Sequence, residues 1–534
     1  MTDDRPTLNT TEDLQAARLE VMRQLDAGEF VEAIQFADSV GGSERYVRFL
    51  RALAYTHAGR ELNDADRLET AIRLWEEATA EPGNRDHYNL ANAELNRWEL
   101  AAKADGFVSA LESHRAHLHR ARALFVDVGR DPKLPDEVRV QALTNLGNSF
   151  DIVGRNADGV EAYREALTLD PDFGMALGNK GVALLGIAPL MQQHVAAGVA
   201  EARDDLDAAL KDRNRILQIG GPPALEHFEK RRASITVRGS GHDSAAASWA
   251  DPYWRWCAQH NLFLHVSPRC IDPEADAYDP LFFRSVTAGL EDEDQRRVND
   301  LFDAFNAMKQ DYAAARYLLW LAEGDASPIR EPGAAVSAKT KYLDSLRYAR
   351  WGARTGVGVQ AFAAATNLID KVACFVHLYF ETSRKIRTVS LRNLWHRPPQ
   401  RNQPIVMDPE LAAHLAPGAF NRGLSALCDL SCDLEQDTPL NDLIERRHSA
   451  THRFLTVHSM LLDDDKSTDG CLEQVTWTEL IDGALSQLAT AHSALIYLAW
   501  TIDIAEKPPP SKQSGGIIAP MPVFPAQTEH AEFD

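Results

Sequence analysis

The sequence has few cysteines, no long apolar run and no excess of positive charge. Its six cysteines are scattered, and only Cys428 and Cys432 lie at helical spacing, a pattern typical of reduced thiols in a cytoplasmic protein. No apolar run reaches the roughly 18 residues that a membrane-spanning helix needs, and the charged segment Met1–Arg5 does not have the pattern of a signal peptide. We therefore expect a cytoplasmic protein without membrane contact.

Several common catalytic motifs are also missing. The sequence contains no Gly-x4-Gly-Lys-Ser/Thr loop, and Gly178–Gly181 lies inside a predicted repeat helix, which argues against ATP or GTP hydrolysis. No Gly-x-Ser-x-Gly turn of a serine hydrolase is present. The cysteines lack the paired spacing of a zinc knuckle, so we expect neither a metal nor a cofactor.

The formal net charge of −22 would repel nucleic acids at long range, so any attraction of RNA must be local. One segment, Thr382–Met407, has no acidic residue but several cations interleaved with Trp395. Basic side chains beside an aromatic ring can bind single-stranded RNA through phosphate contacts and base stacking. A solvated loop in which Trp395 fills the core is the alternative. The candidate RNA-binding residues are Arg384, Lys385, Arg387, Arg392, Trp395, Arg397 and Arg401.

The N-terminal part has the pattern of helical repeats. Its clearest copy begins near Val140, and a second copy begins at Asn179–Gly181, at the period of about 34 residues that is typical of tetratricopeptide repeats. A degenerate copy spans Arg51–Pro82. Such arrays usually bind a peptide or protein, so we expect an unidentified protein partner here. The tetratricopeptide positions of the clearest copy are Leu143, Leu146, Gly147, Phe150, Gly159, Tyr163, Ala166 and Pro171.

A connector follows the repeats. Gly220–Pro223 is predicted to end the array, and the polar, glycine-rich segment Arg238–Ser244 is unsuited to a helix or strand. Aromatic and apolar residues then crowd together, and we interpret them as a small core that docks the repeats onto the next domain, with a ligand box as the alternative. This cluster consists of Trp249, Tyr253, Trp254, Trp256 and Leu262–Leu264.

The six residues Arg447–His452 contain the two residue types that metal-independent RNA cleavage needs. Such cleavage needs a group that moves protons near neutral pH, which His452 can do, and a permanent cation for the charge that develops on phosphorus. The planar guanidinium of Arg447 binds two phosphate oxygens at once. The spacing alone is not specific, because Arg51 with His57 matches it too, and exposed charges on a helix are the alternative.

The region around this motif resembles the HEPN superfamily, in particular its LA2681-like branch. The resemblance implies that Arg447 and His452 form a ribonuclease site, with His448 in the polar position that follows the Arg. Asn is common at that position, so the role of His448 stays open. The segments that carry the resemblance are Leu301–Tyr312, Ala315–Leu319, Asn367–Ala373, Val389–Trp395 and the predicted helix Asn441–Leu462.

A helical-wheel projection of Asn441–Leu462 places Arg447 on the same stripe as Phe454 and Val457, and it places His452 on the opposite side. One straight helix cannot easily direct both side chains at one phosphate, whereas two copies related by a two-fold axis can combine them. The resemblance implies a dimer with composite sites, so we expect a homodimer. Glu445, with His448 and His452 at helical spacing, leaves a transition-metal site as a rival.

Together these observations predict an all-α protein with four parts: tetratricopeptide-like repeats at 1–222, a connector at 223–297, a HEPN-like helical bundle at 298–506 and a disordered tail at 507–534. We expect a metal-independent endoribonuclease that is regulated through its repeats, in antiviral defence or a stress response. The alternative is a non-catalytic adaptor that dimerises or binds RNA through an inactive domain.

Overall fold

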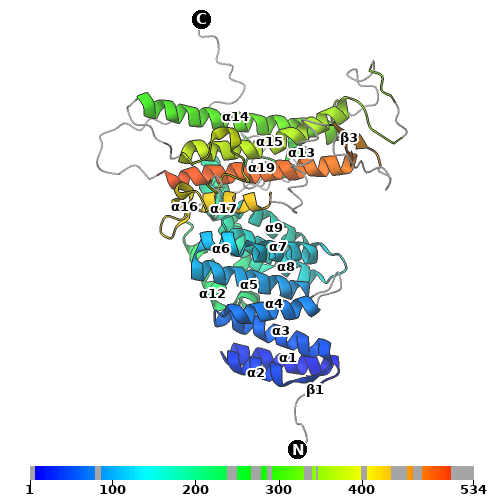
Figure 1. Ribbon diagram of the computed structural model, residues 1–534, viewed down its shortest axis with the longest axis vertical. Coiled ribbons are helices and arrows are strands. Elements are labelled where there is room, and N and C mark those ends of the chain that lie inside the picture. The colour runs from blue at the N-terminus through cyan, green and yellow to red at the C-terminus, as the bar shows by residue number, and fades with distance from the viewer. Residues whose placement is uncertain are drawn as a thin grey trace, which may run out of the picture. The chain divides into compact units, whose positions relative to one another are not determined.

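The computed structural model confirms an all-α fold, with helices interrupted by two small pairs of strands (Figure 1). The structure describes residues 7–78, 86–236, 249–265, 278–283, 286, 292–329, 340–343, 347–397, 406–434, 454–460 and 472–506. This chain divides into two compact units. The first comprises residues up to Ala183 together with Asp205–Ala233 and Ala416–Gly418, and the second comprises the rest.

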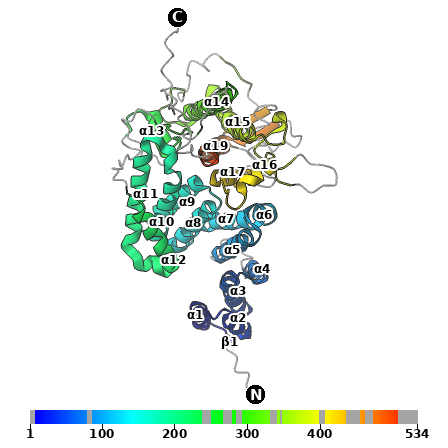
Figure 2. The same cartoon turned by 90° about the vertical axis from the view of Figure 1, so that its left-hand side faces the viewer.

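The first unit is a series of helices in which each packs on the next, from α3 to α9 (Figure 2). A short parallel pair, β1 (Thr7–Leu8) and β2 (Gly41–Gly42), accompanies its first helices. Its helices are α1 (Thr11–Asp26), α2 (Phe30–Ser39), α3 (Glu44–Glu61), α4 (Ala65–Ala78), α5 (His87–Asp105), α6 (Phe107–Ser113), α7 (Arg115–Arg130), α8 (Asp136–Asp151), α9 (Asn156–Leu169), most of α10 (Gly174–Ile187), η2 (Leu210–Asp212) and α12 (Arg213–Ala233).

Small residues let the paired helices of this unit approach closely, as the repeat pattern predicts. Gly147 on α8 lies directly against the ring of Tyr163 on α9, and a methyl group at Gly147 would overlap that ring. Tyr163 is buried, and its hydroxyl donates to Asn148 Oδ1 at 2.9 Å. In the degenerate copy, buried Trp75 donates to the Thr56 hydroxyl at 2.9 Å. The helical-repeat architecture of this part is therefore confirmed.

The end of the array differs from the prediction. Gly220–Pro223 does not end it, because α12 resumes after a kink and continues to Ala233. Gly221 adopts a φ of 69°, a left-handed conformation that glycine tolerates, and this redirects the chain. Pro222 and Pro223 then lie in the first turn after the kink, where a missing N–H costs no hydrogen bond. Residues 184–204, which we expect in the repeat array, belong to the second compact unit. The predicted domain boundaries themselves stay predictions.

The second unit is built around three long helices, α14, α15 and α19, which lie side by side (Figure 1). Their apolar residues are buried along most of their length, which accounts for the unit's core. Besides η1 (Ala188–His194) and most of α11 (Val195–Ala209), its elements are α13 (Pro252–Gln259), α14 (Asp292–Glu323), α15 (Ala353–Phe380), η5 (Ile386–Thr388), α16 (Pro409–Leu415), α17 (Arg422–Cys432), β3 (Phe454–His458), β4 (Leu472–Thr476) and α19 (Trp477–Ala505).

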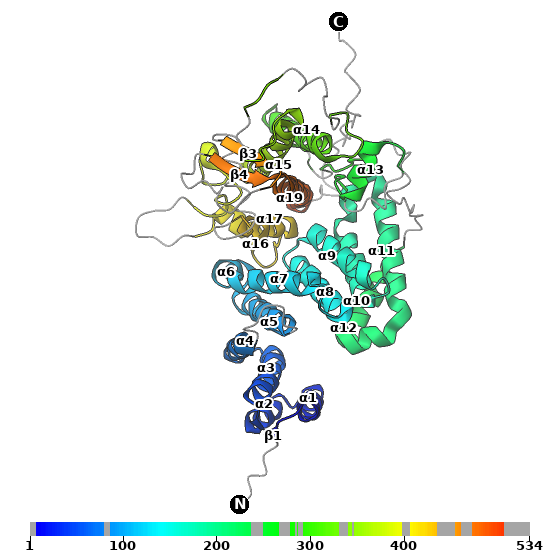
Figure 3. The same ribbon diagram turned by 90° about the vertical axis from the view of Figure 1, so that its right-hand side faces the viewer.

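Strand β3 corrects the predicted helix Asn441–Leu462. Residues Phe454–His458 are extended and pair in parallel with β4, in a register that sets Phe454 opposite Leu472 and His458 opposite Thr476 (Figure 3). The helical-wheel positions of Phe454 and Val457 are therefore wrong. The segment is rich in aromatic and β-branched residues, which favour extended structure when a partner strand is available.

Helix α19 begins with a capping box. The Thr476 hydroxyl accepts a hydrogen bond from Glu479 N at 3.2 Å, and the Glu479 carboxylate accepts one from Thr476 N at 2.7 Å. These bonds satisfy two backbone donors and fix the point at which β4 turns into the helix. Further along, Asn421 caps α17 through Leu424 N and donates to Thr501 O at 2.8 Å, so it ties α17 to α19.

Within the part of the chain that the structure describes, three stretches are long and apolar enough to cross a membrane by length and composition alone: Gly174–Met191, Ala353–Phe380 and Trp477–Ala505. Between 61% and 67% of each stretch is buried inside the protein. Core packing is therefore sufficient to account for their apolar character. The absence of membrane contact stays a prediction.

The close approach of α17 to α19 yields a test. A side chain added at Gly423 would overlap the backbone of Thr501 and Tyr497, so Gly423→Ala is expected to lower the free energy of unfolding by about 1–3 kcal/mol. Gly356→Ala on α15 is the matched control, because no atom lies within 4 Å of its new methyl group. We expect the control to keep or gain stability. Urea denaturation followed by circular dichroism measures both, and equal stability of the two variants would contradict the packing.

Candidate functional site

The predicted catalytic residues Arg447, His448 and His452 lie outside the described residues, and so does Glu445 of the rival metal site. The described chain frames them closely in sequence, with α17 before them and β3 after them. Their roles therefore stay predictions, and the described surroundings of β3 are the part of the candidate site that has geometry. Among the described residues, no group of three or more His, Cys, Asp or Glu side chains is arranged to hold a metal ion.

A second segment pairs with β3 on the edge away from β4. Arg350 N donates to Val457 O at 2.7 Å, and Ser459 N donates to Tyr348 O at 2.9 Å, with an antiparallel bridge between Ala349 and His458. The chain around Tyr348–Arg350 thus lies beside β3, joined to it by one isolated bridge and these two hydrogen bonds. Phe454 follows His452 by only two residues in the sequence, so this segment pairs with the strand that comes directly after the predicted site.

His458 is a poor candidate for proton transfer to a substrate, although Arg453 and His458 fit the loose Arg–His spacing. Its side chain is only 1% exposed, and its Nδ1 lies 2.7 Å from Arg347 O. A ring that is closed off from solvent cannot reach a phosphodiester. We interpret His458 as a residue that fixes the 347–350 segment to β3.

Two arginines are held over one aromatic ring at the start of α19. The guanidinium carbon of Arg350 lies 4.4 Å from the centre of the Trp477 ring, and that of Arg354 lies 5.0 Å from it. Arg354 Nε also donates to Ala322 O at 2.5 Å. Partial burial lowers the pKa of Arg350 without removing its charge. The arrangement holds fixed positive charge beside β3, which suits an anionic ligand.

Aromatic rings near the same segment are exposed. Tyr342 and Trp351 stack at 5.9 Å between ring centres with an angle of 11° between their planes, and each residue is 50% exposed. Tyr348 is 56% exposed and has a positive φ of 57°, which is uncommon for a residue with a side chain. This gives the surface large aromatic faces next to the two arginines.

The predicted RNA-binding segment folds back on itself. Arg397 N donates to Val406 O at 3.0 Å, and Asp408 N donates to Trp395 O at 2.8 Å. Arg384 Nε donates to His396 O at 2.8 Å, and burial lowers the pKa of Arg384. Arg401 lies outside the described residues. The exposed candidate cations are Lys385, Arg387, Arg392 and Arg397.

Trp395 does not lie on the surface with these cations. It is 1% exposed, and its Nε1 donates to Leu391 O at 2.8 Å. A buried ring offers no face to a nucleotide base, which favours the alternative in which Trp395 fills the core. The prediction that the four exposed cations bind RNA stays a prediction.

The connector's aromatic residues form a core within the second unit. Buried Arg316 on α14 donates to both carboxylate oxygens of Asp279, at 3.0 and 2.7 Å, and to Leu262 O at 2.7 Å. Its guanidinium lies 5.7 Å from the ring centre of Tyr253 and 5.4 Å from that of Trp254. The interpretation as packing, and not as a ligand box, therefore fits these residues, and Arg316 is its charged centre.

In the first unit, asparagines from three helices form a hydrogen-bonded row. Asn145 Nδ2 donates to Asn92 Oδ1 at 2.9 Å, which joins α8 to α5. Asn179 Nδ2 donates to Asn148 Oδ1 at 2.7 Å, which joins α10 to α8. All four side chains are half-buried. Because each amide has both a donor and an acceptor, such a row can bind the backbone of an extended peptide.

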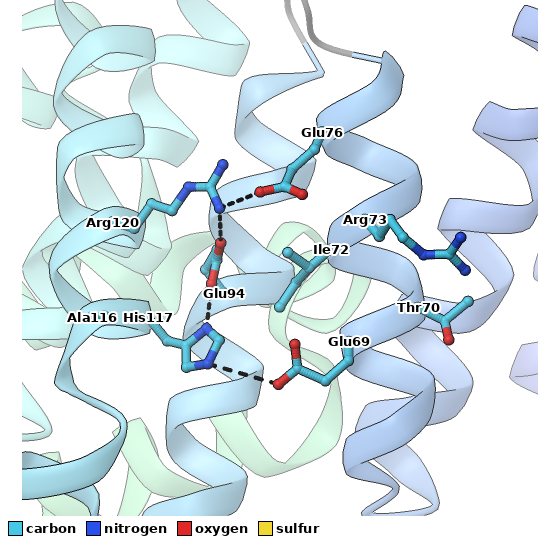
Figure 4. Close-up of a pocket in the computed structure, with 9 residues that line it drawn as sticks. All are labelled: Glu69, Thr70, Ile72, Arg73, Glu76, Glu94, Ala116, His117 and Arg120. Carbon is cyan, nitrogen blue, oxygen red and sulfur yellow. Dashed lines mark hydrogen bonds and ion pairs between the residues drawn. The ribbon is translucent and has the colours of Figure 1, made fainter.

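The first unit also contains a cavity of about 510 Å³ between α4, α5 and α7 (Figure 4). Glu94 is 1% exposed there and lies 2.5 Å from His117 Nδ1 and 2.9 Å from Arg120 Nη1. Arg120 in turn pairs with Glu76 at 2.5 Å, and His117 Nε2 lies 3.7 Å from Glu69 (Figure 4). In this network His117 and Arg120 each bridge two of three carboxylates from α4 and α5. We interpret it as a structural joint between neighbouring helices.

Residues 293–505 match the family model described as LA2681-like HEPN, and this range includes Arg447–His452. This part of the chain is an LA2681-like HEPN domain. The match confirms the resemblance that the sequence carries and indicates an RNA-related or nuclease role. It begins on α14 and ends with α19, so β3, β4 and the arginines over Trp477 belong to the HEPN domain.

Comparison with curated proteins gave no match. Among solved structures, the TPR2AB-domain:pHSP90-complex of yeast Sti1 is similar to this chain at 14% sequence identity and a TM-score of 0.17. The similarity covers 42% of this chain and 98% of that chain. Because this score is low, the assignment of helical repeats rests on the helix pairs and their close glycine contacts.

The residues that the sequence analysis missed lie in and beside the segment that bridges to β3 in the HEPN domain. Tyr342, Trp351 and Arg350 were not singled out, although Lys339–Arg354 contains five cations, three aromatic residues and only one acid. That composition resembles the pattern that drew attention to Thr382–Met407. The pairing with β3 is what makes Lys339–Arg354 part of the candidate site. This pairing connects residues about 110 positions apart, so the local sequence does not reveal it.

The buried ion pair of the HEPN unit yields a test. Asp279→Asn leaves Arg316 buried without its counter-charge, and we expect the free energy of unfolding to fall by about 3 kcal/mol at neutral pH. Asp303→Asn, at an exposed position of α14, is the control and should change stability by less than about 0.5 kcal/mol.

The pH dependence follows from the same pair. Burial alone would raise the pKa of Asp279, but the adjacent Arg316 outweighs this and holds the pKa below its usual value. The contribution of the pair is therefore present above about pH 4 and is lost as the pH falls through the lowered pKa. Urea denaturation at neutral and acidic pH should show the gap between wild type and Asp279→Asn closing in acid, and a constant gap would contradict this account.

Proposed function

We propose that this protein is a metal-independent endoribonuclease of the HEPN type, controlled by a protein or peptide that binds its helical repeats. The observation that carries the proposal is the match of residues 293–505 to the LA2681-like HEPN family, together with the Arg447–His452 motif inside that range. The fixed cations beside β3 support it, because they supply positive charge for an anionic substrate in an otherwise acidic chain.

The proposed reaction is attack of the ribose 2'-oxygen on the adjacent phosphorus. A 2',3'-cyclic phosphate forms, and the bond from phosphorus to the 5'-oxygen of the next nucleotide breaks. His452 takes the proton from the 2'-hydroxyl or supplies one to the leaving 5'-oxygen. Arg447 binds the phosphate oxygens and stabilises the charge that develops on them. His448 orients the phosphate or His452.

We propose that RNA binds to a group of exposed cations in the HEPN domain. Lys385, Arg387, Arg392 and Arg397 are exposed on one segment of the HEPN domain, and Arg401 extends this set in sequence. Contacts from these cations to phosphates would bind RNA without regard to sequence and would weaken with salt. Two HEPN domains in a homodimer would combine Arg447 of one copy with His452 of the other.

Control by a partner is supported by the row of amides in the first unit. The amides of Asn92, Asn145, Asn148 and Asn179 are hydrogen-bonded within the protein, and an extended peptide backbone would have to replace some of these bonds with its own donors and acceptors. A partner bound there would act as the trigger in defence or stress signalling in the cytoplasm, where RNA cleavage arrests growth. The same row favours the second candidate function, an adaptor whose HEPN domain only dimerises or holds RNA.

Incubation of the purified protein with mixed RNA in excess chelator tests the proposal. We expect cleavage in chelator, because the chemistry uses a His and an Arg and no metal ion. Arg447→Ala and His452→Ala should each lower the rate by at least about 100-fold, the usual contribution of a general acid–base or charge-stabilising group.

The matched control is Arg446→Ala, which removes the neighbouring arginine and should keep most of the activity. Loss of activity in Arg446→Ala with activity kept in Arg447→Ala would show that Arg446, six residues before His452, is the arginine of the motif. RNA that stays intact with the wild type, both alone and in an extract that contains candidate triggers, would contradict the nuclease and favour the adaptor.

A further inference from the structure

The stacked pair Tyr342 and Trp351 is an unusual surface feature. The rings lie 5.9 Å apart at 11°, each residue is half exposed, and the adjacent Leu343 is 93% exposed. Large aromatic faces in water are costly, because apolar area left exposed forgoes about 25 cal/mol per Å². A contiguous exposed apolar patch of this kind marks an interaction site more often than a chance arrangement does.

Two cations adjoin these rings along the chain. Lys341 adjoins Tyr342 in sequence and is exposed, and Arg350 adjoins Trp351. Among the described residues, neither cation has a carboxylate partner, and Arg350 is held over the Trp477 ring at 4.4 Å. An apolar protein partner would match the rings but leave these cations uncompensated. A ligand with flat faces and regularly spaced negative charge matches both features.

Backbone pairing sets the position of the aromatic pair relative to β3. Arg350 N donates to Val457 O, so Trp351 lies about one strand spacing from β3. Strand β3 begins at Phe454, two residues after His452 in the sequence. The aromatic pair therefore lies beside the strand that follows the HEPN motif along the chain.

We infer that Tyr342 and Trp351 form a stacking platform for an unpaired base of single-stranded RNA, while Lys341 and Arg350 contact the phosphates that flank that base. Every base offers a flat face to an aromatic ring, so the platform selects single strands over duplexes and not one sequence over another. The inference rests on the proposed function in one respect, namely that the RNA held here is the RNA that the HEPN motif cleaves.

Direct binding to the full-length protein separates the platform from catalysis. The protein carries Arg447→Ala and His452→Ala, so that RNA is not cut, and binding of a labelled, unstructured RNA oligonucleotide is followed by fluorescence anisotropy in chelator. Trp351→Ala is expected to weaken binding about tenfold, the usual effect of removing one stacking ring. Trp351→Tyr keeps a ring and should retain most of the affinity.

Tyr317→Ala is the matched control, because Tyr317 is an aromatic residue on α14 with a similar exposure of 45%. It should bind RNA as tightly as the parent protein. Lys341→Gln should reduce the slope of log affinity against log salt by about 0.7, as expected for one lost contact to a single strand. Circular dichroism of each variant shows whether the helical fold is kept.

The outcomes are distinct. A loss confined to single-stranded RNA and restored by tyrosine supports the platform, even if the wild type never cleaves RNA. Unchanged affinity in Trp351→Ala overturns it, even if the wild type does cleave. An equal loss for single-stranded and duplex RNA also overturns it, and so does Trp351-dependent binding of anionic lipid vesicles without binding of RNA, which would assign the patch to a membrane surface.

Discussion

Helix α19 is the element on which the HEPN unit depends. Helices α14, α15 and α17 pack against it, and both β3 and β4 contact it. Its first residue, Trp477, lies under the guanidinium groups of Arg350 and Arg354, and its capping box fixes where β4 ends. One long apolar helix thus supports the core on its sides and positions the charged surface at its start. Changes in α19 packing are therefore expected to affect Arg350 and Arg354 as well as stability.

Positive charges are concentrated at a few places in this otherwise acidic protein. With a formal net charge of −22, the chain would repel RNA at a distance, yet Arg350 is fixed over an aromatic ring and Lys385, Arg387 and Arg397 are exposed on one segment. Screening at physiological salt limits electrostatic effects to about 8 Å, so a substrate near these cations responds to them more than to the distant acids. Buried Arg316 is different in kind, because Asp279 neutralises it and both serve the core.

The sequence was sufficient for features that depend on local pattern. The spacing of Gly147 and Tyr163 predicted close helix pairs, and the segments around Arg316 and Asn367 predicted the HEPN domain. It was not sufficient where distant backbone decides the outcome. Phe454 and Val457 continued a helical pattern, but they pair with β4 and with Arg350, far away along the chain. Trp395 had basic neighbours typical of an RNA surface, yet the fold buries its ring. The roles of Arg447, His448 and His452 remain predictions.

We propose that this HEPN domain cleaves RNA by attack of the 2'-oxygen. The most direct measurement is the chemical nature of the new ends after incubation of RNA with the purified protein and its trigger. The account predicts fragments with 2',3'-cyclic phosphate and 5'-hydroxyl ends, because the leaving group is the 5'-oxygen. Fragments with 3'-hydroxyl and 5'-phosphate ends, formed only when divalent metal ions are present, would contradict it.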